Sequence, residues 1–124
     1  MWWDDTGLPW VLPSPNMPTL DTAVVYPGMC LFEGCNVSEG RGTTRPFEIF
    51  GAPWINAPAL VDSLDALQLP GVHFRSLSFE PTFQKHAHQI CQGAQIHVSD
   101  RQAYRPVHSG IRILQTIQDL YPDH

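Results

Sequence analysis

The stretch FEGCNVSEGRGTTRPFE, residues 32–48, concentrates the side chains of this sequence that could do chemistry. It supplies carboxylates at Glu33 and Glu39 and guanidinium groups at Arg41 and Arg45. Its three glycines permit positive φ angles and close approach of the backbone to a ligand. Arginine and carboxylate groups form strong, charge-assisted hydrogen bonds. The stretch is therefore a candidate binding or catalytic turn, and a surface turn with solvated charges is the alternative.

Paired carboxylates suggest one specific chemistry, hydrolysis of a glycosidic bond. Such pairs stand about 5 Å apart in retaining enzymes and roughly 6.5–9.5 Å apart in inverting ones. Glu33, Glu39 and the Asp4–Asp5 pair are the candidates. A structural role for Glu39 is equally open, because it could form a salt bridge with Arg41. The turn is no Walker loop, since no Gly-Lys-Ser/Thr follows the glycines.

Metal ligation is the next chemistry to consider. Cys30 and Cys35 could meet His86, His88 and Cys91, but zinc ligands usually come in tighter pairs such as C-x-x-C. The cysteines are more typical of small core residues. We therefore expect neither a metal nor a cofactor.

Hydrophobic periodicity predicts the elements that must position these residues. The expected elements are a helix from Leu20, capped by Thr19 and closed by Pro27-Gly28; a kinked strand over Phe47–Ile55; a helix from about Pro58, capped by Asn56; a strand over Val72–Phe79 with a bulge; a strand over Ala94–Asp100; and a helix over Pro106–Tyr121. The last helix presents one apolar stripe, formed by Val107, Ile111, Leu114, Ile117, Leu120 and Tyr121.

These elements predict an α+β fold in which a small mixed sheet of about three short strands is packed by about three helices. Four prolines among the first 18 residues predict a stiff, irregular amino-terminal arm. A length of 124 residues fits one domain, residues 1–124.

Charge and composition exclude several classes of function. Apolar residues make up 43% of the chain, a globular balance, and the net charge is −5 with only seven Lys and Arg. Neither nucleic acid nor an anionic membrane surface is an expected partner. No apolar run approaches the roughly 20 residues that span a bilayer, and no signal peptide opens the chain. We expect a soluble chain without a targeting signal and with reduced cysteines.

Two longer runs carry a resemblance to a known family. These runs are PSPNMPTLDTAVVYPGMCLFEGCNVSEGRGTTRPFEIFGAPWI and FEPTFQKHAHQICQGAQIHVSD. Together they resemble the carboxy-terminal portion of the exo-β-N-acetylmuramidases of bacterial peptidoglycan recycling, long classed as a domain of unknown function. The similarity covers Trp3 to Tyr121, and the S-E-G-R-G-T run behind P-S-P-N-M-P is highly specific. The chain departs from the family pattern at Cys35, where Thr is expected, and at His88, where a small residue is expected.

The resemblance implies that this chain supplies one wall of an active-site cleft. Family members are about three times longer and carry a Rossmann-like amino-terminal domain, so that domain is an expected partner, in cis or in trans. They are bacterial and often exported, and they release N-acetylmuramic acid from the non-reducing ends of cell-wall fragments. The partners implied for this chain are accordingly peptidoglycan-derived muropeptides or disaccharides.

The resemblance also implies roles for individual residues. Glu39 is the catalytic candidate of this chain, although the family's Glu-His-Gly motif lies in the missing half. Arg41 is expected to bind the lactyl carboxylate of the muramyl sugar, with Arg45 as the substitute. The remaining substrate-binding candidates are Asn16, Ser38, Thr43, Thr44 and His86. The alternative function is a non-catalytic peptidoglycan-binding or partner-docking module.

Overall fold

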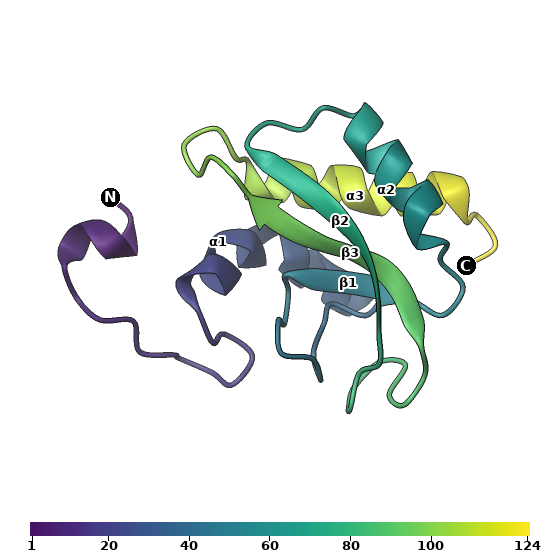
Figure 1. Cartoon of the computed structure of the whole chain (residues 1–124), viewed down its shortest axis with the longest axis horizontal. Coiled ribbons are helices and arrows are strands. Elements are labelled where there is room, and N and C mark those ends of the chain that lie inside the picture. The colour runs from purple at the N-terminus through teal and green to yellow at the C-terminus, as the bar shows by residue number, and fades with distance from the viewer.

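The computed structural model describes all residues from Met1 to His124, and its regular part is a three-stranded sheet packed by three helices (Figure 1). In chain order the elements are the 3-10 helix η1 (Trp3–Thr6), α1 (Leu20–Met29), the 3-10 helix η2 (Cys30–Gly34), β1 (Ile49–Ala52), α2 (Ala57–Ala66), β2 (Val72–Phe79), β3 (Cys91–Val98) and α3 (Pro106–Leu120). Residues 8–18 form neither helix nor strand, and Figure 1 shows this segment, in purple, leading away from the sheet. The predicted α+β class, with three strands and three helices, is confirmed.

The sheet has the strand order β1-β3-β2 and is antiparallel throughout, so the prediction of a mixed sheet is wrong. Hydrophobic patterns do not encode strand direction. The direction follows instead from residues 80–90, which turn the chain back on itself between β2 and β3. The register between these strands runs without a gap from Val72 opposite Val98 to Phe79 opposite Cys91, so the predicted bulge is absent.

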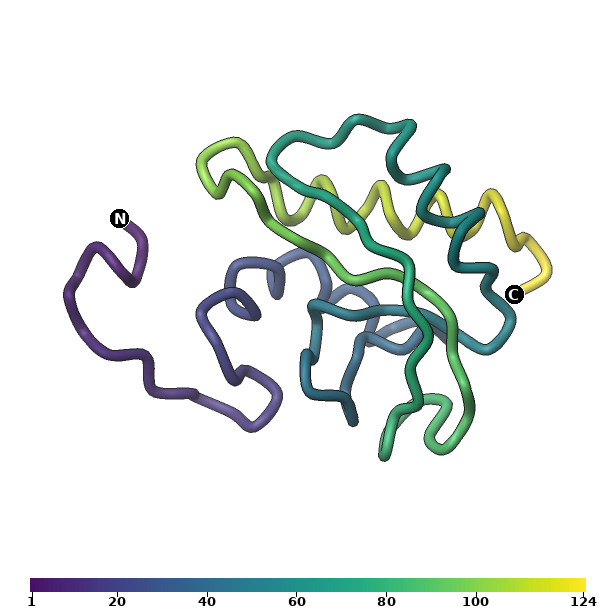
Figure 2. The backbone as a smooth tube through the Cα atoms, in the orientation of Figure 1, coloured from purple at the N-terminus to yellow at the C-terminus, as the bar shows by residue number.

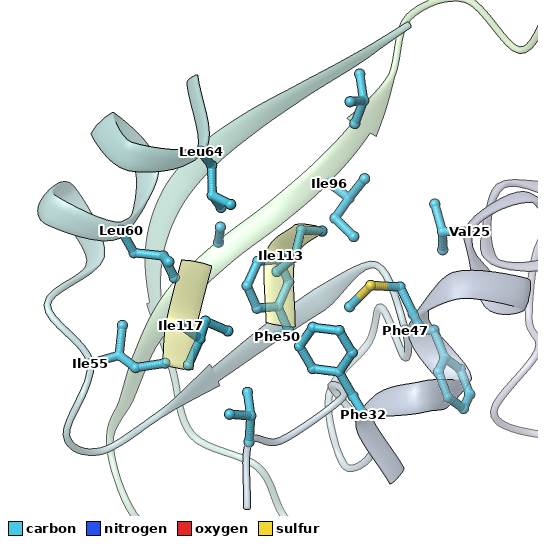
Figure 3. Close-up of a cluster of buried hydrophobic side chains, with 14 of the residues drawn as sticks. Val25, Phe32, Phe47, Phe50, Ile55, Leu60, Leu64, Ile96, Ile113 and Ile117 are labelled. Carbon is cyan, nitrogen blue, oxygen red and sulfur yellow. The ribbon is translucent and has the colours of Figure 1, made fainter. Parts of the chain in front are cut away.

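One face of the sheet forms the core together with the helices. Phe50 of β1 and Ile96 of β3 point toward Leu60 of α2 and toward Ile113 and Ile117 of α3 (Figure 3). Alternation along a strand sends every second residue to the opposite face. That opposite face of the sheet carries the loops of the candidate site.

The helix caps match the sequence, whereas one helix end does not. The Oγ1 atom of Thr19 accepts a hydrogen bond from the Thr22 amide at 3.3 Å, and the Oδ1 atom of Asn56 accepts one from the Ala59 amide at 3.0 Å. Contrary to the prediction, α1 continues through Pro27 and Gly28 to Met29. A proline in a helix removes one intrahelical donor. The residue after the proline, Gly28, packs closely against Pro106 and Gly110 of α3.

The other differences concern element bounds and the buried face of α3. β1 has four residues, Ile49–Ala52, and β3 begins at Cys91 rather than at Ala94. In α3, Val107, Ile111 and Leu120 are 49%, 51% and 39% exposed, so they do not belong to the buried stripe. No helix in the chain combines the length and the apolarity needed to cross a bilayer.

Candidate functional site

The turn between η2 and β1, residues 38–46, is anchored to the sheet at its first residue. Ser38 and Gly51 exchange two backbone hydrogen bonds, of 2.8 and 3.1 Å. Gly40 and Gly42 both have φ of +84°, which side chains rarely tolerate. A Cβ atom on Gly42 would lie 2.7 Å from the carbonyl oxygen of Phe83. The two glycines therefore let the turn reverse direction while in contact with the loop between β2 and β3.

That second loop, residues 80–90, is tied to the turn by several hydrogen bonds. The backbone amide and Oγ1 of Thr82 both donate to the carbonyl of Gly42, at 3.0 and 3.1 Å. The Nε2 atom of His86 lies 2.6 Å from the carbonyl oxygen of Asn36. Figure 2 shows both loops projecting from the same side of the sheet. Segments about 40 residues apart in sequence therefore form one structural unit.

A buried cluster of charges lies beneath these two loops. Glu39 is 2% exposed, and its Oε2 atom accepts a hydrogen bond from Lys85 Nζ at 3.0 Å. The same ammonium group donates to the carbonyl oxygens of Phe32, at 2.6 Å, and Val37, at 3.2 Å. Burial of an ionised carboxylate is costly unless the carboxylate is paired and hydrogen-bonded, as it is here. These contacts favour a structural role for Glu39 over direct acid–base catalysis.

Arg41 lies at the edge of this cluster and is partly accessible. Its Nη2 atom donates to Glu33 at 3.2 Å, its Nε atom lies 3.9 Å from Glu39, and its guanidinium carbon lies 5.4 Å from the centre of the Phe47 ring. The side chain is 28% exposed, and the buried Nε atom has no hydrogen-bond partner. The guanidinium is thus held in place while most of its five donors remain available.

Thr43 and Thr44 line an open groove of about 620 Å³ next to this cluster. The Oγ1 atom of Thr43 donates to the carbonyl of Gly40 at 2.6 Å, which stabilises the turn. Thr44 is exposed and its hydroxyl makes no hydrogen bond within the chain. Of the two predicted threonines, Thr44 is therefore the one with a free hydroxyl.

Three further predicted substrate-binding residues, Ser38, His86 and Asn16, occupy different environments. Ser38 is 1% exposed, and its Oγ accepts a hydrogen bond from the amide of Gly40 at 3.2 Å, so its role is structural. His86 holds the Asn36 carbonyl, as described above. Asn16 lies in the amino-terminal segment, and no hydrogen bond connects it to residues 38–46. The structure does not bring Asn16 into the cluster.

Arg45 belongs to a separate pair at the far end of the turn. Its Nη1 atom lies 3.7 Å from Oε1 of Glu48, and the arginine is 47% exposed. Glu48 is buried and accepts a hydrogen bond from Oγ1 of Thr22 at 2.9 Å. Desolvation raises the pKa of the Glu48 carboxyl, although the Thr22 hydrogen bond and the Arg45 charge oppose the shift. Arg45 therefore balances a buried acid of the core and is less free to bind a ligand than Arg41.

The site contains side chains that the motifs did not single out. Lys85 and the groove residues Phe79 and Phe83 are not among the binding residues predicted above. Alternation along β2, which puts Leu77 and Phe79 on the face opposite the core, could have indicated Phe79, whereas Phe83 and Lys85 lie in the loop that follows and carry no such signal. No group of three or more His, Cys, Asp or Glu side chains is arranged to hold a metal ion.

Comparisons with known proteins identify the family. Residues 24–124 match the family described as "Exo-beta-N-acetylmuramidase NamZ, C-terminal". The chain is 54% identical over 120 residues to the peptidoglycan β-N-acetylmuramidase NamZ of Bacillus subtilis (strain 168). This alignment covers 97% of the chain but only 29% of that relative.

Solved structures agree with this result. A DUF1343 family protein of Bacteroides fragilis NCTC 9343 superposes with a TM-score of 0.93 at 34% identity, over 99% of this chain and 32% of that protein. A second DUF1343 protein of the same organism, 24% identical with a TM-score of 0.51 over 89% of this chain and 27% of its own, supports the fold alone. The chain belongs to the exo-β-N-acetylmuramidase NamZ family and corresponds to its carboxy-terminal domain.

Proposed function

We propose that this chain forms the part of a peptidoglycan exo-β-N-acetylmuramidase that recognises the muramyl sugar. The observation that carries the proposal is the geometry of Arg41, a partly exposed guanidinium fixed by Glu33 and by the Phe47 ring. N-Acetylmuramic acid differs from N-acetylglucosamine by a lactyl carboxylate, and a planar guanidinium matches a carboxylate through two parallel hydrogen bonds.

The proposal assigns Glu39 to the support of Arg41. Its Oε2 atom is occupied by Lys85, and its Oε1 atom lies 3.9 Å from Arg41 Nε. The catalytic carboxylates then belong to the part of the relatives that this chain does not match, a Rossmann-like domain in cis or in trans. This chain supplies one wall of the cleft between the two parts.

Glu33 is the group that an incoming carboxylate would displace. It is 39% exposed and holds Arg41 through one hydrogen bond of 3.2 Å. Exposed ion pairs contribute at most about 1 kcal/mol, whereas a carboxylate bound to arginine in a partly desolvated cleft contributes about 1.5–3 kcal/mol. The exchange of Glu33 for the lactyl group is therefore favourable.

The test is the Arg41→Lys substitution in a full-length relative. We expect the preference for a muramyl over a glucosaminyl ligand to fall about ten- to a hundredfold, because lysine lacks the fork that binds two oxygens. Competition binding with the two ligands measures this ratio. Glu33→Gln is the matched control and should keep or increase the preference. An unchanged ratio in Arg41→Lys would remove Arg41 from the role.

A second candidate function is a peptidoglycan-binding or docking module without catalysis. The burial of Glu39 favours it for the chain alone, since the one carboxylate predicted to be catalytic cannot reach a substrate. The isolated chain should then bind muropeptides, or a separate amino-terminal domain, without releasing muramic acid. Release of muramic acid by the isolated chain would contradict both this assignment and the support role of Glu39.

A further inference from the structure

The groove beside the charge cluster lies on the face of the sheet opposite the core. Its floor contains Ile49 of β1 and the outward-facing Leu77 and Phe79 of β2. In the register of β1 and β3, Gly51 lies directly opposite Gly93 on this same face. Because Gly51 has no side chain, the Phe79 ring lies close against this part of the sheet: a Cβ atom on Gly51 would be 2.9 Å from a Phe79 ring carbon.

The two loops of the candidate site form the walls of this groove. One wall is Gly42–Thr44 and the other runs from Glu80 to Phe83. Thr82 joins the walls through its two hydrogen bonds to Gly42. Phe83 is 49% exposed, a large fraction for a phenylalanine in a chain with its own core. The groove is thus a built feature with an accessible aromatic side chain on its rim.

The lining of the groove defines the chemistry of its ligand. It contains apolar and aromatic side chains, three threonines, Ser78 and Glu80, and it contains no lysine, arginine or histidine. No hydrogen bond within the chain uses the side chains of Thr44 or Glu80. Ser78 stands between the outward-facing Leu77 and Phe79, so its own side chain points to the other face of the sheet. The lining therefore disfavours an anion and offers an apolar surface beside free hydrogen-bonding groups. A neutral sugar ring, with one apolar face and hydroxyl and amide groups at its edge, has the complementary properties.

We propose that this groove binds an uncharged N-acetylhexosamine ring, the sugar adjoining the muramyl residue in the glycan. The inference rests on the proposed function, because it places two consecutive sugars on one turn. Arg41 binds the charged sugar, and Thr44, three residues later, contacts the neutral one. Phe83 covers the apolar face of the neutral ring, while Glu80 bonds to its polar edge.

The experiment is a titration of the isotope-labelled chain with N,N′-diacetylchitobiose, a neutral disaccharide, followed by the backbone amide shifts. We expect saturating shifts at residues 42–44 and 77–83. Phe83→Ala should raise the Kd by about tenfold through loss of the apolar contact. Ile90→Ala is the matched control, because Ile90 is an apolar residue of the same loop, 71% exposed and outside the groove. It should leave the Kd unchanged.

The outcomes separate this inference from the proposed function. Arg41→Lys should leave binding of the neutral disaccharide intact while it weakens binding of the muramyl ligand. If Arg41→Lys loses the muramyl preference but the neutral disaccharide causes no amide shifts at the groove, the groove proposal is wrong and the role of Arg41 stands. Shifts that do not saturate, that fall outside the groove, or that respond equally to Phe83→Ala and Ile90→Ala overturn the inference. Because Phe83 is half exposed, an unchanged spectrum away from the loop shows that the variant is folded.

Discussion

Lys85 is the single residue on which the geometry of the candidate site most depends. Its ammonium group satisfies one buried carboxylate and two carbonyl oxygens, and these acceptors come from three positions between η2 and the turn. A buried ion pair contributes little net free energy compared with apolar packing, but removal of one partner leaves an uncompensated charge. The cluster therefore fixes the position of Glu39, and through it the orientation of Arg41, more than it stabilises the fold.

Substitutions of Lys85 and of Glu39 should lower the free energy of unfolding by different amounts. Lys85→Met leaves the Glu39 charge and the Phe32 and Val37 carbonyls without a donor, and should lower the free energy of unfolding by about 2–3 kcal/mol. Glu39→Gln leaves Lys85 with its two carbonyls and partial exposure, and should cost about 1 kcal/mol or less. Urea unfolding of both variants and of the double variant measures these values. If Glu39→Gln is the more damaging, the support role assigned to Lys85 is wrong.

The sequence predicted which residue types gather at the site better than it predicted their partners. The salt bridge considered for Glu39 was with Arg41, two residues away, whereas its short contact is with Lys85, 46 residues away. Such a partner depends on how residues 80–90 return to the turn, and no local pattern encodes that path. His88, where the family resemblance leads one to expect a small residue, has φ of +62°. The backbone there takes a conformation that glycine adopts without strain.

At the scale of elements, the contact between α1 and α3 depends on two glycines. A Cβ atom on Gly110 would lie 2.6 Å from the carbonyl oxygen of Gly28, and one on Gly28 would lie 1.9 Å from that of Pro106. The helices therefore pack with their backbones in direct contact. The predicted apolar stripe of α3 differs from the observed buried face for this reason. The buried face includes Gly110, which has no apolar side chain and therefore does not appear in a hydrophobic pattern.

Gly110→Ala tests this contact. The added methyl group meets backbone atoms that cannot rotate away, so the helices must separate, and we expect a loss of about 2–3 kcal/mol in the free energy of unfolding. Alanine's better helix propensity, about 1 kcal/mol, offsets only part of the loss. The control is Gly34→Ala, where the added methyl has nothing within 4 Å. Equal midpoints for the two variants in urea would show that the contact is loose.

At the scale of the whole molecule, the core is assembled without the first 19 residues. None of these residues is buried, and the cluster of 17 buried apolar residues begins at Val24. The sequence predicted the domain elements because their apolar periodicity reflects this core. It could not place the amino-terminal segment, whose prolines restrict φ but do not specify a contact.

Contacts at the edge of the core hold that segment, where the half-buried Trp2 packs against the cluster. Arg101 donates two hydrogen bonds to Asp4, at 3.1 and 2.5 Å, and its guanidinium lies 5.0 Å from the ring of Trp2. The Asp4 hydrogen bond raises the pKa of Arg101, and the pKa of Asp4 is lowered in turn. Both groups are solvent-exposed, so the attraction between them is screened by water and salt. The segment is therefore attached by surface contacts to the loop between β3 and α3 and by the packing of Trp2 against the edge of the core.

Deletion of residues 1–16 should accordingly leave the domain folded. We expect one cooperative thermal transition with a Tm lowered by less than about 5 °C, because surface ion pairs contribute little and Trp2 is only partly buried at the edge of the core. Circular dichroism measures the transition, and Thr19 is retained so that α1 keeps its cap. Arg101→Ala in the full chain is the matched variant and should reproduce most of the shift, because it releases the same anchor. A non-cooperative transition in the shortened chain, with Arg101→Ala unaffected, would show that the segment stabilises the domain through contacts other than this anchor.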